Sequence, residues 1–306
     1  MTIAWQLGLF STYHDFSLIV NSSMSIKNIS VIGAGTMGNG IAHVFAQNGY
    51  DVTLVDVGQQ ALDRAIATIT ANLGRQVKKG AITEDDQKNT LAHIKTETQL
   101  ATSVKAADFV IEAATERYDL KKEIFQTLDN NAREGVILAS NTSSISVTEL
   151  AATTKRASHV IGMHFFNPVP VMKLVEIIRG LATTDEVYST VKALSEKVGK
   201  TPVEVNDAPG FVSNRILMPM INEAIYTLME GVAKAEDIDT VMKLGMAHPM
   251  GPLQLADFIG LDVCLAIMNV LHDGLGDSKY RACPLLKKMV AAGMLGKKSG
   301  RGFYKY

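Results

Sequence analysis

The sequence predicts an α/β protein, in which a Rossmann-type domain with a mainly parallel sheet is followed by an all-α C-terminal domain. Three observations support this fold class. Short apolar runs alternate with helical stretches, as in doubly wound parallel sheets. Gly33, Gly35 and Gly38 form a G-x-G-x-x-G turn directly after the first apolar run. Only helical periodicity follows these units, so we expect domains at residues 26–205 and 206–306.

Each expected element rests on its local pattern. Strands are predicted from short apolar runs, and helices from amphipathic stretches, several of which end at a glycine. The expected strands lie at 29–32, 52–55, 109–112, 136–139, 160–165, 174–178 and 202–205. In the first domain, the expected helices follow Gly38 as far as Asn48 and then lie at 59–79, 118–130 and 185–198. A short segment with two prolines joins the strands at 160–165 and 174–178, which predicts a hairpin.

Composition excludes several classes of protein. The 306 residues are 47% hydrophobic and 20% charged, unlike a disordered chain. The formal net charge of −1 provides no global positive field for nucleic acid or anionic lipid. Cys264 and Cys283 lie outside any metal-ligand spacing, so we expect no metal site. Mean hydropathy is +0.12 and we find no membrane-length apolar run, so we expect a cytoplasmic protein without a membrane partner.

Residues 1–25 precede the predicted first strand. They contain no Lys or Arg, unlike a secretory signal or a mitochondrial presequence. We interpret them as an N-terminal extension without fixed structure, which includes Trp5, the only tryptophan of the chain. A mis-assigned start before Met24 would explain the extension, and a functional arm is the alternative.

The glycine turn predicts a dinucleotide site. Backbone N–H groups and the N-terminus of the following helix would bind the pyrophosphate. Asp56 ends the next strand, where its carboxylate can accept hydrogen bonds from both ribose hydroxyls. An acid there repels a 2′-phosphate, and the next arginine is Arg64, so NAD is favoured over NADP. FAD, or a glycine turn that only allows tight packing, is the alternative.

His164 and Glu176 are candidates for acid–base chemistry. Each lies six residues from Pro170, so a hairpin centred there places them opposite each other, with Cβ atoms about 5 Å apart. The carboxylate would fix the imidazole tautomer and raise its basicity, which leaves the other ring nitrogen to exchange a proton with substrate. A structural His–Glu pair is the alternative interpretation.

Further polar candidates lie at the ends of the predicted elements. Ser140–Ser144 follows the strand at 136–139, at the carboxyl end of the sheet, where such folds bind ligands. These hydroxyls would lie near the nicotinamide, or else cap the helix that begins near Ser146. Asn214 lies in the first turn of the second domain, and the sequence leaves open whether it faces the cleft.

Several ordered motifs resemble those of a known family. They are Asn141–Ser144 (NTSS), His164–Pro168 (HFFNP), Met172–Glu176 (MKLVE), Pro209–Arg215 (PGFVSNR), His248–Pro252 (HPMGP) and Gly296–Gly300 (GKKSG). Together they resemble the L-3-hydroxyacyl-CoA dehydrogenases, most closely the stand-alone bacterial 3-hydroxybutyryl-CoA dehydrogenases. The resemblance covers about residues 26–306.

The resemblance implies the reversible, NAD-dependent oxidation of a (3S)-3-hydroxyacyl-CoA to the 3-ketoacyl-CoA in fatty acid or butanoate metabolism. A short acyl chain is the leading expectation. His164 would take the hydroxyl proton, and Glu176 would orient His164. Ser143 would bind the reacting oxygen, Asn214 would complete the substrate pocket, and Asn167 would be a further support near that pocket.

Further contacts are implied by the same resemblance. It assigns cofactor contacts to Glu116, Lys121, Ser143, Asn167 and Lys298. Lys79 would bind the CoA phosphates, and Asn72 occupies the place of a serine that the family often uses for CoA. The helical domain would bind substrate and form a homodimer.

Two other functions stay open from the sequence. Related two-domain dehydrogenases act on sugar acids or other small hydroxy acids, and fold does not fix function. Lys79 argues against such substrates, because they have no CoA tail. A non-catalytic NAD-binding protein is the other alternative, and the presence of His164, Glu176, Ser143 and Asn214 argues against it.

Overall fold

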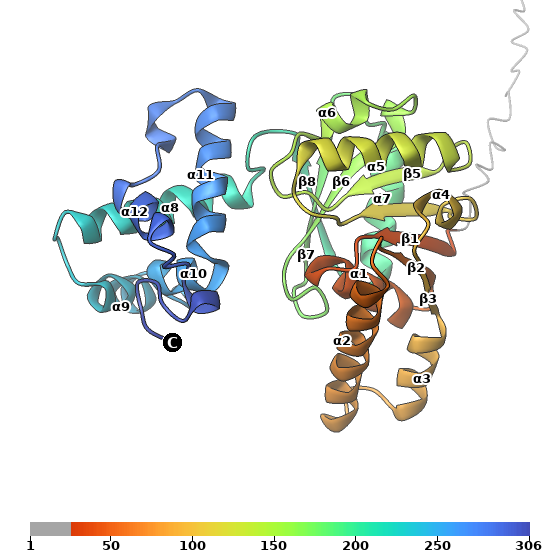
Figure 1. Ribbon diagram of the computed structural model, residues 1–306, viewed down its shortest axis with the longest axis horizontal. Helices are drawn as coiled ribbons and strands as arrows, with labels where there is room; N and C mark the ends of the chain where they lie inside the picture. Colours follow the sequence, from red (N-terminus) through yellow and green to blue (C-terminus); the bar gives the residue numbers. More distant parts are fainter. Residues whose placement is uncertain (1–25) are drawn as a thin grey trace, which may run out of the picture.

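The computed structural model describes residues 26–306, and the predicted N-terminal extension lies outside the described residues. The described chain forms two parts, a sheet with its helices and a separate group of helices (Figure 1). The chain passes from the first part to the second between Asn206 and Ser213. The predicted fold class, a mainly parallel sheet followed by helices alone, is confirmed.

The first part contains one eight-stranded sheet with the order β3-β2-β1-β4-β5-β6-β7-β8. The strands are β1 (Asn28–Ile32), β2 (Asp51–Val55), β3 (Ile94–Glu97), β4 (Phe109–Glu112), β5 (Ile137–Ser140), β6 (Val160–Phe165), β7 (Leu174–Arg179) and β8 (Thr201–Asn206). The helices are α1 (Thr36–Gln47), α2 (Gln59–Lys78), α3 (Glu84–Ala92), α4 (Leu100–Ser103), α5 (Tyr118–Asn131), α6 (Val147–Ala152) and α7 (Asp185–Lys197). Every strand pair is parallel except β6 and β7, which form the predicted hairpin.

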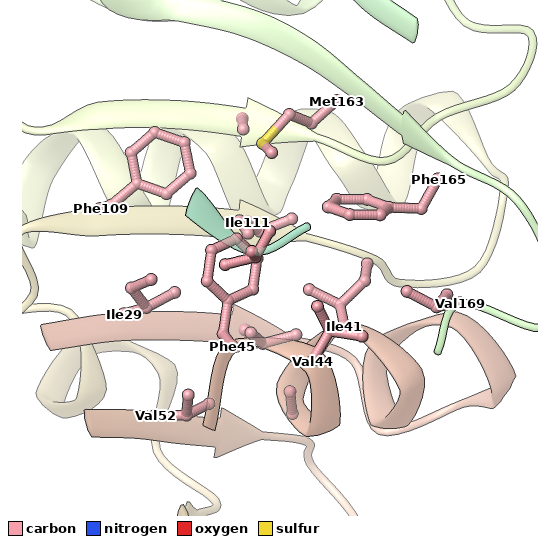
Figure 2. Close-up of a cluster of buried hydrophobic side chains, with 14 of the residues drawn as sticks. Ile29, Ile41, Val44, Phe45, Val52, Phe109, Ile111, Met163, Phe165 and Val169 are labelled. Atoms are coloured by element: carbon pink, nitrogen blue, oxygen red, sulfur yellow. The ribbon is translucent and has the colours of Figure 1, made fainter. Parts of the chain in front are cut away.

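The central strands β4, β5 and β6 are buried on both faces because their apolar residues alternate between two cores. In β4, Phe109 and Ile111 pack into the core on the α1 face, whereas Val110 packs into the core on the α5 face. The core on the α1 face is shown in Figure 2, where Phe45 of α1 meets the strand residues. Phe45 and Phe165 pack edge to face, with ring centroids 6.4 Å apart. This packing fixes the end of β6 directly after His164.

Three elements of the first part, α3, β3 and α4, differ from the sequence-based expectation, which contained none of them. The strand β3 reads Ile-Lys-Thr-Glu, lies at the edge of the sheet and has no fully buried residue. An edge strand of this composition lacks the apolar run from which strands are predicted. Its position is set by pairing with β2 and not by its own pattern.

The second part consists of helices packed around one apolar core. They are α8 (Ser213–Met229), α9 (Ala235–Gly245), α10 (Pro252–Ile259), α11 (Leu261–Leu275) and α12 (Pro284–Ala291). Asp257 is fully buried and binds the C-terminal segment, because its carboxylate accepts hydrogen bonds from the backbone N–H groups of Phe303 and Tyr304. Within residues 26–306, no helix alone has the length and apolarity to cross a membrane, although α10 and α11, bent by 98°, meet that test as a pair.

Candidate active site

The three glycines of the turn after β1 each serve a different steric need. Gly33 has φ +101°, and a Cβ atom there would lie 2.6 Å from the carbonyl oxygen of Ala113. A Cβ atom at Gly38 would lie 1.7 Å from the carbonyl oxygen of Gly33, so α1 packs tightly on the turn. At Gly35, by contrast, a Cβ atom would meet no other described atom within 4 Å. This open side is where the backbone can approach a pyrophosphate.

A cavity of about 510 Å³ extends from the glycine turn along the first half of α2. Asp56 lies in its wall at the end of β2 and accepts hydrogen bonds from the backbone N–H groups of Ala34 (2.9 Å) and Gly58 (3.1 Å). Arg64 also lies in the wall, because one face of α2 carries Ala61, Arg64 and Thr68 at helical spacing. The helix therefore brings Arg64 into the same cavity as Asp56, although the two residues are not close in the sequence.

The predicted opposition of His164 and Glu176 is confirmed. The two residues are directly paired across β6 and β7, and Nδ1 of His164 lies 2.8 Å from Oε2 of Glu176. Both are buried, with exposed fractions of 8% and 2%. Burial alone would raise the pKa of Glu176, but hydrogen bonds from His164 and Ser213 outweigh it and hold the pKa below its usual value. The carboxylate is therefore ionised at neutral pH and accepts the Nδ1 proton, which leaves Nε2 for a substrate.

Two aromatic rings lie beside the imidazole of His164. The ring of Phe166 has its centroid 4.6 Å from that of His164, and the ring of Phe211 lies 6.0 Å away. Phe166 follows β6, whereas Phe211 lies two residues before the start of α8. The two rings cover the pair of His164 and Glu176, one from the end of β6 and the other from the start of the helical part. Their apolar surroundings strengthen the electrostatic interaction between the imidazole and the carboxylate.

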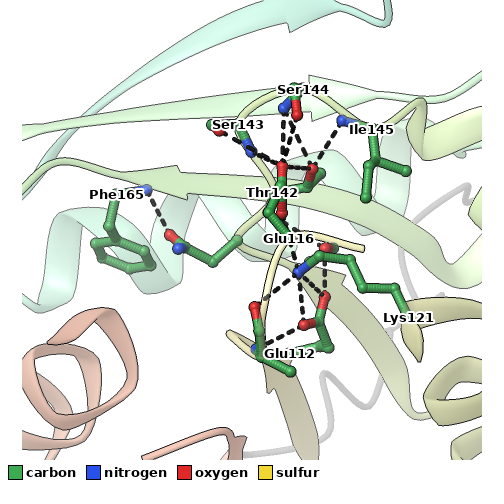
Figure 3. A network of polar contacts seen from close by, with 11 residues as sticks. Glu112, Glu116, Lys121, Thr142, Ser143, Ser144, Ile145 and Phe165 are labelled. Carbon is green, nitrogen blue, oxygen red and sulfur yellow. Dashed lines mark hydrogen bonds and ion pairs between the residues drawn. The ribbon is translucent and has the colours of Figure 1, made fainter. Parts of the chain in front are cut away.

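The serine loop, residues 141–145 after β5, is held by the carboxylate of Glu116 (Figure 3). One oxygen, Oε1, accepts hydrogen bonds from the hydroxyl of Thr142 (2.6 Å), the backbone N–H of Ser143 (2.9 Å) and the N–H and hydroxyl of Ser144 (3.1 and 2.9 Å). Burial raises the pKa of Glu116, but the charge of Lys121 and these hydrogen bonds lower it by more, so the net shift is downward. Glu116 thus fixes the backbone that carries Ser143.

Beneath Glu116 lies a second carboxylate, Glu112, which sequence reasoning missed. The ammonium of Lys121 lies 2.6 and 2.9 Å from the two oxygens of Glu112 and 3.3 Å from Glu116. Ser140 donates a hydrogen bond of 2.6 Å to Glu112. Lys121 is only 1% exposed, so the structure places it as a support of the serine loop, and its contact with NAD stays a prediction. The one signal for Glu112 is an acid at the end of an otherwise apolar strand.

Asparagine side chains join the segments of the site. Asn214 is buried in the first turn of α8, and its amide donates a hydrogen bond of 3.2 Å to the carbonyl of Ser143. The sequence leaves open whether Asn214 faces the cleft, and this hydrogen bond places its amide against the serine loop. In the serine loop, Asn141 accepts a hydrogen bond of 2.9 Å from the backbone N–H of Phe165. Residues from β5, β6 and α8 therefore meet at one point. Asn167, three residues after His164, is exposed and stays a predicted contact.

Lys200 anchors the loop between β6 and β7, and sequence reasoning missed it as well. Its ammonium is buried and donates to the carbonyls of Val169 (2.5 Å) and Met172 (2.7 Å). Burial lowers the pKa of Lys200. Since the loop also carries Asn167, Lys200 indirectly sets the shape of the chain next to His164.

The predicted CoA and outer cofactor residues lie apart from the His–Glu pair. Asn72 and Lys79 are two helical turns apart on α2, so they share one face, on which Arg75 donates a hydrogen bond to Asn72. Lys298 lies in the helical part and is ion-paired with Asp262 at 2.5 Å. Like Glu116, Lys121, Ser143 and Asn167, it is not among the residues that line the dinucleotide cavity in the described chain, so its contact with NAD stays a prediction.

Three kinds of comparison relate the chain to known proteins. Residues 28–208 match the family model "3-hydroxyacyl-CoA dehydrogenase, NAD binding domain", and residues 210–306 match the C-terminal domain of the same family. A probable 3-hydroxybutyryl-CoA dehydrogenase of Bacillus subtilis is 60% identical over 283 residues, which cover 92% of this chain and 98% of the relative. The 3-hydroxybutyryl-CoA dehydrogenase of Bradyrhizobium diazoefficiens is 55% identical over 281 residues, which cover 92% and 96%. The crystal structure of (S)-3-hydroxybutyryl-CoA dehydrogenase from Ralstonia eutropha has a TM-score of 0.90 at 55% identity and covers 92% of this chain and 99% of that one.

Proposed function

The chain belongs to the 3-hydroxyacyl-CoA dehydrogenase family, and we propose that it is an NAD-dependent 3-hydroxybutyryl-CoA dehydrogenase. It oxidises (3S)-3-hydroxyacyl-CoA reversibly to the 3-ketoacyl-CoA. The observation that carries the proposal is the buried pair of His164 and Glu176 at the carboxyl end of the sheet, joined to the serine loop through Asn141. A base with an ionised orienting group at this edge suits proton removal from a bound alcohol.

The residues around the glycine turn fit NAD. Gly35 leaves the approach to the N-terminus of α1 open, and in the described chain no side chain caps that terminus. The free N–H groups of its first turn suit the oxygens of a pyrophosphate. Asp56 uses part of its carboxylate to hold the turn and has further lone pairs for ribose hydroxyls. When bound, NAD supplies the acceptor for the hydride from the third carbon of the substrate.

The proton is handled by the chain itself. Nε2 of His164 takes the proton of the 3-hydroxyl, and the resulting imidazolium is stabilised by Glu176, whose Oε2 lies 2.8 Å from Nδ1. Ser143 donates to the reacting oxygen, in a position fixed by Glu116 and by the amide of Asn214. In the reverse direction, the imidazolium returns the proton to the developing alkoxide.

The CoA part of the substrate would lie along α2. Lys79 is exposed at the C-terminal end of this helix, one turn from Arg75 and two from Asn72. These cationic and amide groups suit phosphate oxygens. A hydroxy acid without a CoA tail has no group that reaches this face, so the face favours the CoA ester over a sugar acid.

The proposal includes a cytoplasmic homodimer assembled through the helical part. Large apolar side chains are exposed on its surface, namely Ile216, Val232, Val241, Leu244, Met246 and Phe258. Such a concentration on one part of a protein marks an interaction surface. Light scattering coupled to size-exclusion chromatography tests the dimer, and a monomeric mass at micromolar concentration would contradict it.

Turnover of defined substrates tests the function. The purified chain is mixed with NAD⁺ and (S)-3-hydroxyacyl-CoA esters of increasing chain length, and NADH absorbance is followed. We expect the largest kcat/KM for the four-carbon ester and little activity with free 3-hydroxybutyrate. No NADH formation from any of the CoA esters would refute the proposal.

A further inference from the structure

Ser213, the first residue of α8, has a side chain that the proposed mechanism does not use. Its hydroxyl donates a hydrogen bond of 2.9 Å to Oε2 of Glu176, and its backbone N–H donates one of 2.9 Å to Oε1. A serine at a helix start often caps its own helix. In the described chain, however, α8 begins without any side-chain cap, and the hydroxyl of Ser213 points across to β7. The hydroxyl is therefore committed to the catalytic pair and not to the helix.

Two donors meet at the same carboxylate oxygen. Oε2 of Glu176 accepts from Nδ1 of His164 at 2.8 Å and from the hydroxyl of Ser213 at 2.9 Å. The carboxylate is thus fixed from two directions, which restricts its rotation and that of the imidazole. The positive end of the hydroxyl dipole also reduces the negative potential that Oε2 presents to the imidazole. Ser213 therefore affects both the orientation and the charge balance of the pair.

The groups that contact the imidazole of His164 include two aromatic rings and one carboxylate. Phe166 from the loop after β6 and Phe211 from the segment before α8 contribute aromatic rings, and Glu176 from β7 is the charged group in contact with the imidazole within residues 26–306. A change in how His164 titrates after a substitution at position 213 is therefore transmitted through Glu176.

The neighbouring residue makes a matching contact. Asn214 holds the carbonyl of Ser143, while Ser213 holds Glu176. Two consecutive residues at the start of α8 thus attach the helical part to both sides of the candidate active site.

We propose that the hydroxyl of Ser213 is a positioning group that orients the pair of His164 and Glu176 and limits how strongly Glu176 stabilises the imidazolium. The inference rests on the proposed function. It predicts a loss of turnover with little change in substrate affinity when the hydroxyl is removed, because Ser213 contacts Glu176 and not the substrate.

A matched pair of variants tests the hydroxyl itself. Ser213→Val and Ser213→Thr have nearly the same shape, but only the threonine keeps the hydroxyl, while the backbone N–H stays in both. We expect Ser213→Val to lower kcat roughly three- to tenfold, with KM for both substrates within about twofold of wild type. The acid limb of the pH profile for oxidation should move upward by roughly half a pH unit. Ser213→Thr should keep wild-type values, and Ser213→Ala, the smallest change, should behave as Ser213→Val.

A second readout does not depend on turnover. The ¹⁵N resonances of His164, identified by their loss in His164→Gln, give the pH midpoint of its titration in each folded variant. The midpoint should rise in Ser213→Ala and Ser213→Val and stay unchanged in Ser213→Thr. Unchanged midpoints and kcat in Ser213→Ala, or equal effects of Val and Thr, would overturn the inference. Failure of the proposed function appears differently, as absence of turnover in the wild-type enzyme.

Discussion

Glu176 and Glu116 hold two sides of the same site, and they differ in the kind of cation each one faces. Glu176 is paired with His164, whose charge changes during the proposed proton transfer, whereas Glu116 is paired with Lys121, which takes no part in that transfer. In both, burial raises the pKa, but other interactions outweigh it: hydrogen bonds from His164 and Ser213 for Glu176, and the charge of Lys121 together with hydrogen bonds for Glu116. Two carboxylates with similarly lowered pKa values can therefore have different roles. In our proposal, Glu176 stabilises the imidazolium during turnover, whereas Glu116 holds the serine loop in place. Substitutions should separate the two roles.

Removal of the titrating partner gives the largest expected effect. His164→Ala should lower kcat by about 10³-fold, because the variant has no base at the substrate hydroxyl. NAD affinity should persist, since the glycine turn belongs to β1 and α1 and does not contain His164. Steady-state kinetics and NADH-fluorescence titration measure the two quantities. Appreciable turnover by His164→Ala would rule out the role of His164 as general base.

Neutralising Glu176 should have the next largest effect. Glu176→Gln keeps the shape of the side chain but removes the charge that stabilises the imidazolium, so we expect kcat to fall about 10²-fold. KM for the acyl-CoA should change little. Glu204→Gln is the control, because Glu204 lies half-exposed on β8 and pairs with Arg179. A raised KM with unchanged kcat would instead place Glu176 in substrate binding.

Glu116→Gln should act on stability more than on turnover. We expect the free energy of unfolding to fall by about 2 kcal/mol at neutral pH, because charge-assisted hydrogen bonds become neutral and Lys121 loses part of its compensation. A carboxyl whose folded pKa is lowered contributes stability above its unfolded pKa of about 4.3, and this contribution is lost as pH falls through the folded pKa. The difference from wild type should therefore shrink in acid.

Urea unfolding at a series of pH values from neutral to about pH 3 measures this difference. Turnover of folded Glu116→Gln should fall less than that of Glu176→Gln, since Ser143 keeps the contact between its carbonyl and Asn214. A destabilisation that does not change with pH would show that the charge of Glu116 is not its cause.

The local parts of the site could be predicted from sequence. The glycine turn and the pairing of His164 with Glu176 follow from short-range patterns, a fixed motif in one case and equal distances from Pro170 in the other. The mainly parallel sheet follows from the alternation of apolar runs and helices. Each of these features is specified by residues close together in the chain.

The supports of the site could not be predicted in this way. A lysine in an amphipathic helix reads as a solvated side chain, yet Lys121 is buried because β4 ends in an acid that lies beneath α5. Lys200 is likewise buried, and its partners are backbone carbonyl groups about thirty residues away. Every residue has such a carbonyl, so the side chains of the sequence do not indicate which ones Lys200 will contact. The GKKSG motif around Lys298 likewise does not indicate the position of this lysine in the helical part, where it pairs with Asp262.

A third carboxylate, Asp56, sharpens the comparison because it is bound by backbone N–H groups and faces no cation at hydrogen-bond distance in the described chain. Asp56→Ala should reduce the preference for NAD over NADP roughly tenfold, as the repulsion of a 2′-phosphate disappears and Arg64 in the same cavity wall can approach it. The ratio of kcat/KM values for the two cofactors measures this preference.

Asp63→Ala, on the exposed face of α2, is the matched control and should leave the ratio unchanged. Adding Arg64→Gln to Asp56→Ala should remove the gain in NADP use but not restore NAD affinity. A ratio unaffected by Asp56→Ala would show that Asp56 holds the glycine turn alone and does not meet the ribose.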